Sequence, residues 1–420
     1  MALVALMVLV GGLTRLTESG LSIVKWKLVT GTLPPMSADA WQEEFREYQT
    51  SPQFQKVNRG FSLADFKQIY WLEYAHRLLG RLVGLTIFVP WGYFLIRLRT
   101  TGGATSVPLP TGEVEIPCRA ISPHANVREG ISGEGGYTHK PSPDAPKNAS
   151  TSPMGRGFPV APFALHRFIL RRGFAMAVLV ALQGTVGWIM VASGLHDEPR
   201  VAPLKLALHL SLALALFLLM LWTDWQLRDA GSVVPPPIGG RLEPAPDVIR
   251  GGGLIQTPHS MAAPLPASPR WGDGLQRAAR ILFALIFLQV IFGALVAGLR
   301  AGLSYNTYPL MDGKLIPSGL WTLEPWWRNH LESVLTVQFQ HRTLAVCVAM
   351  GVLGFAGMSW KHPPHRGALK LALAAIFLQF SLGVATLLSG VHIALASAHQ
   401  FGALLLLSAG LRLVYIHRAA

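Results

Sequence analysis

Long apolar runs are the feature that most limits what this chain can fold into. A helix that crosses the hydrocarbon of a bilayer needs about 20 predominantly apolar residues. Seven runs of that kind lie near residues 70–97, 173–192, 204–223, 278–298, 333–358, 368–389 and 393–416. An eighth, "MALVALMVLVGGL", opens the chain but has only about 13 residues. Either the true start lies upstream of Met1, which we favour, or this first helix is shortened at its inner end. The runs predict an all-α integral membrane protein with eight transmembrane helices.

Composition and charge agree with a membrane protein. The chain is 51% hydrophobic and only 14% charged, which is typical of that class. A formal net charge of +14 would suit a nucleic-acid partner, but the basic residues gather at the ends of the apolar runs, as orientation signals do. We therefore expect no nucleic acid and a cytoplasmic or matrix location for the basic ends. These carry Arg97, Arg99, Arg171, Arg172, Arg228, Arg277, Arg280, Lys361, Arg366 and Lys370.

The segments between the runs are of two kinds. Residues 100–160 and 229–272 are rich in Pro, Gly, Ser and Thr without apolar periodicity, which predicts disordered cytoplasmic insertions. Two long segments, near 14–69 and 299–332, face the opposite side. In the first, Trp41, Phe45 and Tyr48 follow helical spacing, and we predict a short helix lying on the outer membrane surface.

The chain repeats itself. "LMVLVGGLTRLTESGLS" (6–22) aligns without gaps to "LQVIFGALVAGLRAGLS" (288–304), and "LQGTVGWIMVASG" (182–194) to "LQFSLGVATLLSG" (378–390). "YAHRLLG" and "FQHRTLA" correspond in the same order. We predict a duplicated four-helix unit. One bundle comprises residues 1–99 and 161–228, and the other residues 273–420.

Each half places two histidines in its apolar runs. His76 corresponds to His341, and His209 to His399. All four follow the outer starts of their helices by about six to nine residues, or about 9–14 Å. Two imidazoles that face each other across a four-helix bundle can ligate both axial positions of a heme iron. A helix–helix hydrogen bond is the alternative for any single one. No Cys-X-X-Cys-His motif occurs, so covalent heme attachment is not indicated.

Arginine follows the first histidine in both halves, and glutamine recurs in the third helix of each. Arg77 and Arg342 can pair with heme propionates or with lipid headgroups. Gln183 and Gln379 are expected to bridge helices where glycine allows close approach.

The two halves differ beside their first histidines. Glu73 lies three residues before His76, on the same helical face, whereas Gln338 stands before His341. A buried carboxylate can take up protons or stabilise positive charge on a substrate. A structural ion pair of Glu73 with Arg77 or Arg81 is the alternative. The difference suggests that the two sites do different work.

Several of these segments resemble one known family. "GGLTRLTESGLSIVKWKLVTGTLPP", "WLEYAHRLLGRLVG", "NTYPLMDG", "QFQHRTLA" and "SAHQFGALLLL" resemble heme A synthases of the branch that proteobacteria and mitochondria share. The resemblance covers the chain apart from the two insertions. It implies an oxidoreductase that converts the C8 methyl of heme O into the formyl group of heme A, for cytochrome c oxidase.

The resemblance also implies roles for individual residues. His341 and His399 would ligate a heme b cofactor, with Arg77 and Arg342 among the cofactor-binding residues. His76 and His209 would flank the substrate heme O, with Glu73 as the catalytic carboxylate. A related bacterial branch has a cysteine pair in the outer loop, which this sequence lacks.

The location and the partners follow from the same resemblance. We expect a multi-pass protein of the bacterial inner membrane, or of the mitochondrial inner membrane in a eukaryote. Expected partners are membrane lipid, a heme O synthase, cytochrome c oxidase assembly proteins and a second copy of the chain. Two other functions stay open: a diheme b-type electron carrier, and a heme transporter or chaperone. Both would leave Glu73 without a chemical role.

Overall fold

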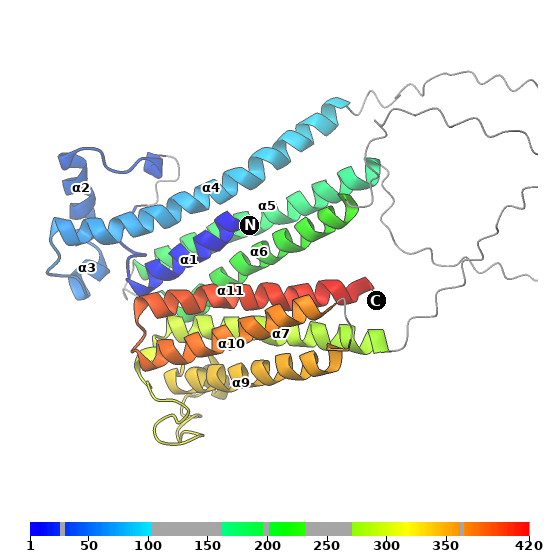
Figure 1. The fold of residues 1–420 in the computed structure, drawn as a ribbon. Coiled ribbons are helices and arrows are strands. Elements are labelled where there is room, and N and C mark those ends of the chain that lie inside the picture. The colour runs from blue at the N-terminus through cyan, green and yellow to red at the C-terminus, as the bar shows by residue number, and fades with distance from the viewer. Residues whose placement is uncertain (26–29, 102–161, 196–200, 232–270, 362–364, 420) are drawn as a thin grey trace, which may run out of the picture.

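The protein folds almost wholly into helices in a computed structural model (Figure 1). The structure describes residues 1–25, 30–101, 162–195, 201–231, 271–361 and 365–419. Within those ranges the only β-type pairing is an isolated bridge between Met311 and Lys314. The predicted insertions at 100–160 and 229–272 lie almost entirely outside the described residues.

Seven of the described helices are long and apolar enough to cross a membrane. They are α4 (Leu63–Thr101), α5 (Pro162–Gly194), α6 (Pro203–Gly231), α7 (Trp271–Gly298), α9 (Val334–Ser359), α10 (Arg366–Leu388) and α11 (Ile393–Ile416). The apolar run at the start of the chain forms the shorter helix α1 (Ala2–Leu16). The prediction of an all-α, multi-pass membrane protein is confirmed.

Helix α4 begins at Leu63, ahead of the predicted start near residue 70. Ser62 and Asp65 cap this end reciprocally, because the Ser62 hydroxyl accepts from the Asp65 N–H at 3.3 Å and the Asp65 carboxylate accepts from the Ser62 N–H at 2.9 Å. The added turns are partly polar, so a search for apolar runs does not find them. They extend the helix beyond the predicted span on the side of the outer segment.

The helices of the two predicted halves lie on opposite sides of the molecule (Figure 1). Helices α1, α4, α5 and α6 form one group, and α7, α9, α10 and α11 the other. The groups also pack on each other, α6 against α7 and α1 against α11. One hydrophobic cluster runs through both, with Val8, Val83, Ile286 and Leu407 among its buried members. A division into two separate four-helix bundles therefore stays a prediction.

The outer segment before α4 contains the short helices α2 (Ala38–Gln49) and α3 (Pro52–Lys56), which form a small aromatic cluster with α4. The predicted helix is present, and its aromatic stripe packs on α4; its position on the outer membrane surface stays a prediction. Trp41 and Tyr48 pack on α4, with ring centroids 4.9 Å from Tyr70 and 5.1 Å from Phe66 respectively. The outer turns of α4 supply an aromatic surface that a search for membrane spans does not reveal. Burial raises the pKa of the Tyr48 hydroxyl, which keeps it neutral.

Short helices complete the described connections. They are η1 (Thr30–Thr32), η2 (Ala301–Leu303), η3 (Trp326–Arg328), α8 (Asn329–Glu332) and η5 (His417–Ala419).

Candidate functional site

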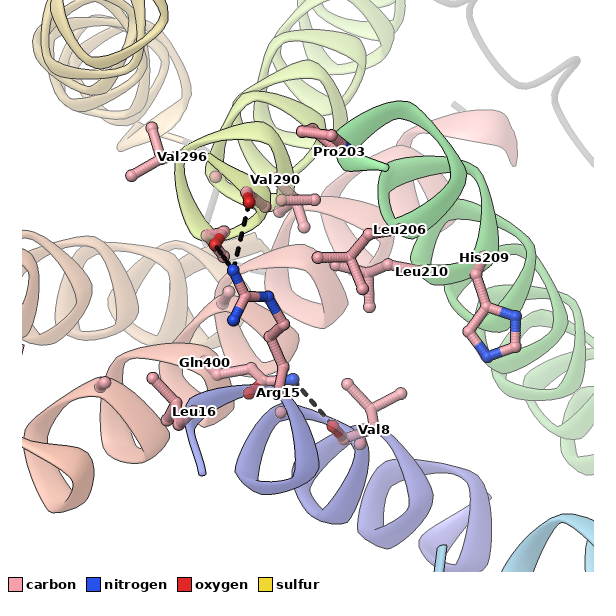
Figure 2. A pocket seen from close by; sticks show the side chains of 18 of the residues that line it. Val8, Arg15, Leu16, Pro203, Leu206, His209, Leu210, Val290, Val296 and Gln400 are labelled. Atoms are coloured by element: carbon pink, nitrogen blue, oxygen red, sulfur yellow. Dashed lines mark hydrogen bonds between the residues drawn. The ribbon is translucent and has the colours of Figure 1, made fainter. Parts of the chain in front are cut away.

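A large cavity opens among the described transmembrane helices. Its volume is about 1370 Å³, above the range of about 300–1,000 Å³ that is usual for small-molecule sites. Its walls are mainly apolar and come from both halves of the chain. All four predicted histidines, His76, His209, His341 and His399, line it. Figure 2 shows one part of this cavity, with His209 on α6 at its edge.

Each of the four histidines packs against a glycine on a neighbouring helix. A Cβ added at Gly11 would lie 3.0 Å from Nε2 of His76, and one at Gly293 would lie 3.2 Å from Cε1 of His341. At Gly187 and Gly383 the added Cβ would lie 2.9 Å from Cε1 of His209 and His399 respectively. Any larger residue would push the ring. The repeated glycines thus leave room for imidazoles at equivalent places in both halves.

A glutamine stands one helical turn before three of these four glycines. Gln183, Gln289 and Gln379 place their side-chain nitrogens 3.1, 3.5 and 3.4 Å from Nε2 of His209, His341 and His399 respectively. Gln183 and Gln379 bridge neighbouring helices as predicted. Sequence reasoning missed Gln289, although the recurring Gln-X-X-X-Gly spacing could have found it. The fourth position, before Gly11, is Met7.

In both halves of the chain, nitrogens of the histidine rings can still coordinate a metal. The Nδ1 atom of His399 lies 3.2 Å from the Gln379 carbonyl oxygen. A proton on Nδ1 that donates to this carbonyl leaves the Nε2 lone pair for a metal. The Nδ1 atoms of His209 and His341 are buried and have no hydrogen-bond partner among the described residues. His76 and His209 lie within electrostatic range of each other, as do His341 and His399.

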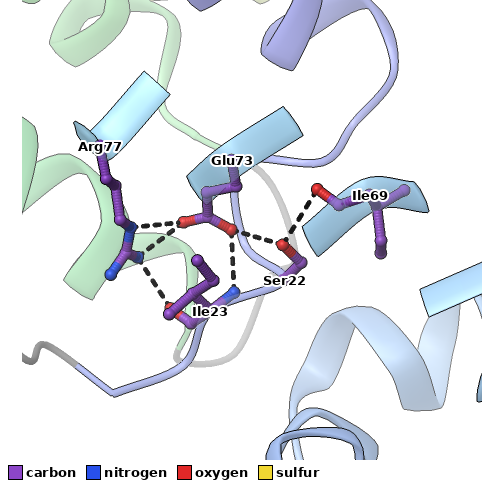
Figure 3. Close-up of polar contacts among 5 residues, drawn as sticks. All are labelled: Ser22, Ile23, Ile69, Glu73 and Arg77. Carbon is purple, nitrogen blue, oxygen red and sulfur yellow. Dashed lines mark hydrogen bonds and ion pairs between the residues drawn. The ribbon is translucent and has the colours of Figure 1, made fainter. Parts of the chain in front are cut away.

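Glu73 is buried in the cavity wall and fully engaged (Figure 3). Its Oε1 accepts from Arg77, with Nη2 at 2.6 Å and Nε at 3.0 Å. Its Oε2 accepts from the Ser22 hydroxyl at 2.7 Å and from the Ile23 N–H at 2.8 Å. The ion pair with Arg77 is one of those that the sequence left open. Because Glu73 also lines the cavity, the ion pair and a chemical role are compatible.

The second half has an amide, Gln338, at the position equivalent to Glu73, and it keeps the neighbouring arginine contact. Gln338 donates from Nε2 to the Tyr305 carbonyl at 3.0 Å. Arg342 donates from Nη2 to the same carbonyl at 2.6 Å, just as Arg77 donates from Nη2 to the Ile23 carbonyl at 2.8 Å. Ile23 and Tyr305 each follow directly on the gap-free alignment of 6–22 with 288–304, so they are equivalent as well. The arginines therefore hold the same backbone position in both halves.

Polar contacts join the halves where they meet at the cavity (Figure 2). Arg15 of α1 donates to the carbonyls of Ala297 and Gly298, which end α7, at 2.8 and 3.1 Å. Gln400, next to His399 on α11, donates to the Val8 carbonyl at 2.8 Å. An ion pair between Glu18 and Arg300 lies beside them. These contacts place the two histidine pairs around one shared space.

Comparison with known proteins places this architecture in a family. The model of the COX15-CtaA family, described as cytochrome oxidase assembly proteins, matches residues 1–112 and 159–411. The chain belongs to this family. The two stretches that match omit most of the first insertion, and they include all four histidines and Glu73.

Relatives in the COX15-CtaA family match over nearly their whole length. The chain is 37% identical over 414 residues to a protein of Nitrosospira multiformis named heme A synthase, covering 98% of this chain and 89% of the relative. A protein of the same name from Parvibaculum lavamentivorans is 38% identical over 419 residues, covering 100% and 92%. One from a Bradyrhizobium strain (ORS 278) is 40% identical over 412 residues, covering 97% and 86%.

Proposed function

We propose that this protein catalyses the reaction for which those relatives are named. It oxidises the C8 methyl of heme O to a formyl group, and the product is heme A for cytochrome c oxidase. The observation that carries the proposal is a cavity that holds two histidine pairs in unlike surroundings. A buried carboxylate stands beside one pair, and an amide stands at the equivalent place beside the other.

The residues present fit two hemes. The cavity is large and mainly apolar, as a porphyrin requires, and each histidine ring has a glycine beside it in place of a bulkier side chain. At His399, the Nδ1 atom lies 3.2 Å from the Gln379 carbonyl oxygen, and a histidine that ligates a metal through Nε2 usually donates its other ring N–H to such an acceptor. Bound heme iron would supply the redox chemistry.

We assign the histidine pairs to different hemes. His341 and His399 hold a resident heme b, in the half whose neighbouring side chains Gln289, Gln338 and Gln379 are uncharged. His76 and His209 flank the substrate heme O, in the half that carries the carboxylate. Arg342 has a buried Nε without a hydrogen-bond partner among the described residues, which can take a heme propionate. We assign Arg77 to a heme propionate from its equivalent place in the repeat alone, because its Nε donates to Glu73.

Glu73 has a chemical task beside the substrate. With water as the source of the formyl oxygen, oxidation of the methyl group releases four protons, and four electrons to an acceptor, so a base that lines the site speeds the reaction. Its ion pair with Arg77 fixes the carboxylate within the cavity wall. A charged carboxylate at that place also stabilises positive charge that develops on the substrate.

We place the protein in the bacterial inner membrane, with the basic helix ends on the cytoplasmic side. In Figure 1 the predicted cytoplasmic helix ends lie together, opposite α2 and α3. A heme O synthase and oxidase assembly proteins are the partners that this reaction would require for supply and delivery.

Extraction of the bound hemes tests the proposal. The purified protein, co-expressed with a heme O synthase, is extracted with acidic acetone and its hemes are separated by chromatography. We expect heme A, or its hydroxylated precursor, together with heme B. Heme B alone at two per chain, despite available heme O, would support a diheme electron carrier. Unchanged heme O beside heme B would support a transporter or chaperone.

A further inference from the structure

Among the groups that hold the Glu73 carboxylate, Ser22 has an ability that the others lack. The Ile23 N–H and the Arg77 guanidinium can only donate hydrogen bonds, so neither can accept one from a protonated carboxyl group. The Ser22 hydroxyl can donate and also accept. It lies 2.7 Å from Oε2 of Glu73, and both side chains are buried, each with 2% of its surface exposed.

A second acceptor lies within reach of the same hydroxyl (Figure 3). The Ile69 carbonyl oxygen, one helical turn before Glu73, is 3.4 Å from the Ser22 Oγ. The hydroxyl has one hydrogen, which can point to either oxygen. Since a carbonyl oxygen has two lone pairs, Ile69 can accept it while keeping its bond within the helix.

We propose that Ser22 is a positioning residue that holds Oε2 of Glu73 in place both before and after that oxygen takes up a proton. With the carboxylate charged, the Ser22 hydrogen points to Oε2. When Oε2 gains a proton that the substrate releases, the new O–H donates to Ser22 Oγ, and the Ser22 hydrogen turns to the Ile69 carbonyl. No heavy atom has to move. The inference rests on the proposed role of Glu73 in heme O oxidation.

The second half of the chain has the equivalent serine, but among the described residues this serine does not contact a buried carboxylate. Ser304 ends the repeated "GLS" and is equivalent to Ser22, yet it is exposed. Its counterpart of Glu73 is Gln338, which donates to the Tyr305 carbonyl instead. The buried hydroxyl therefore occurs where a carboxylate needs a partner, and Ser304 provides a matched control outside the cavity lining.

The first test measures heme O conversion by Ser22→Ala, Ser22→Thr and Ser304→Ala. A hydrogen bond to a charged group is strong enough that we expect kcat of Ser22→Ala to fall about tenfold, with KM for heme O within about twofold of the wild type. Ser22→Thr keeps the hydroxyl and should restore most of kcat. Ser304→Ala should behave as the wild type. A wild-type kcat in Ser22→Ala, or an equal loss in Ser304→Ala, would overturn the proposal.

The second test does not depend on turnover. Infrared difference spectra between the purified wild type and Glu73→Gln identify the Glu73 carboxylate band, because this variant removes it. We expect Ser22→Ala to shift this band and Ser304→Ala to leave it unchanged; a band unmoved by Ser22→Ala contradicts the proposal. If Glu73→Gln is fully active, the role of Glu73 fails. If Glu73→Gln is inactive while Ser22→Ala is not, only the role of Ser22 fails.

Discussion

The surroundings of His76 and His341 show what changed between the two halves and what did not. Both rings pack on a glycine of the preceding transmembrane helix. Both are followed by an arginine that donates to an equivalent backbone carbonyl. The shared contacts fix the position of the helices and the ring.

The differences gather around His76. Glu73 replaces the amide of Gln338, and Met7 stands where Gln289 approaches His341. The other histidines, His209 and His399, keep the same glutamine and glycine neighbours. If the halves arose by the predicted duplication, they diverged mainly at one of their four histidines. This localised change is what we expect if one heme is retained as a cofactor and the other is transformed.

The largest expected effect is on the content of the resident heme b. His341→Ala should remove heme b from the purified protein, because the iron loses one of its two axial ligands. His76→Ala should keep it, since His76 serves the other site. The pyridine hemochrome spectrum measures heme b per chain. His392→Ala, at the start of α11 and outside the cavity lining, is the control. Full heme b in His341→Ala would show that the assignment is wrong.

The second-largest effect should come from removing the Glu73 carboxylate. Glu73→Gln gives the first half the side chain of the second, and we expect heme O conversion to fall about 100-fold or more, as removal of a general base does. Heme b content should not change. The reverse change, Gln338→Glu, should not create a second converting site. Full conversion by Glu73→Gln would remove this carboxylate from the mechanism.

Substitution of the glycines that pack against His399 and His209 tests whether these equivalent contacts serve different hemes. Gly383→Ala and Gly187→Ala each bring a Cβ to 2.9 Å from a histidine ring, and such overpacking costs about 1–3 kcal/mol. We expect Gly383→Ala to lower heme b content and Gly187→Ala to lower heme O conversion with heme b kept. Gly354→Ala, with nothing within 4 Å of its added Cβ, should change neither. Equal heme b loss in both variants would argue against the division of labour.

The smallest effect should come from the ion pair between the halves. The Glu18 and Arg300 side chains are 33% and 35% exposed, so solvent screens the pair, which contributes up to about 1 kcal/mol to stability. Glu18→Arg and Arg300→Glu should each lower the thermal stability slightly, and the two together should restore it. Heat unfolding in detergent measures this. A double variant less stable than either single one would show that the two charges do not interact.

Much of this fold was visible in the sequence, because the relevant signals are local. Apolar length predicts the spans, and the repeat predicts which histidines and glycines correspond. Residues outside the bilayer were harder to predict. The aromatic stripe of α2 looks the same whether it meets lipid or Phe66 of α4, since both are apolar partners.

The partners of Glu73 could not be predicted for a similar reason. Ser22 and Ile23 are far from Glu73 along the chain and reach it through a loop whose path no periodicity encodes. Gln289 was overlooked because its counterpart is Met7, so the alignment of the halves drew no attention to it. A search within each half for the Gln-X-X-X-Gly spacing would have found it.

The ion pair of Glu18 with Arg300 also bears on how such a chain arose. The two residues are equivalent in the gap-free alignment, and both have left-handed backbone conformations, with φ of 57° and 54°. Contact between equivalent positions means that they lie near the axis relating the two copies. If the halves arose by the predicted duplication, an ancestor made of two identical subunits had the same residue at both positions and could not form this ion pair. Opposite charges then require that the two copies mutated separately, so this contact favours pairing of the two unlike halves over pairing of two like ones.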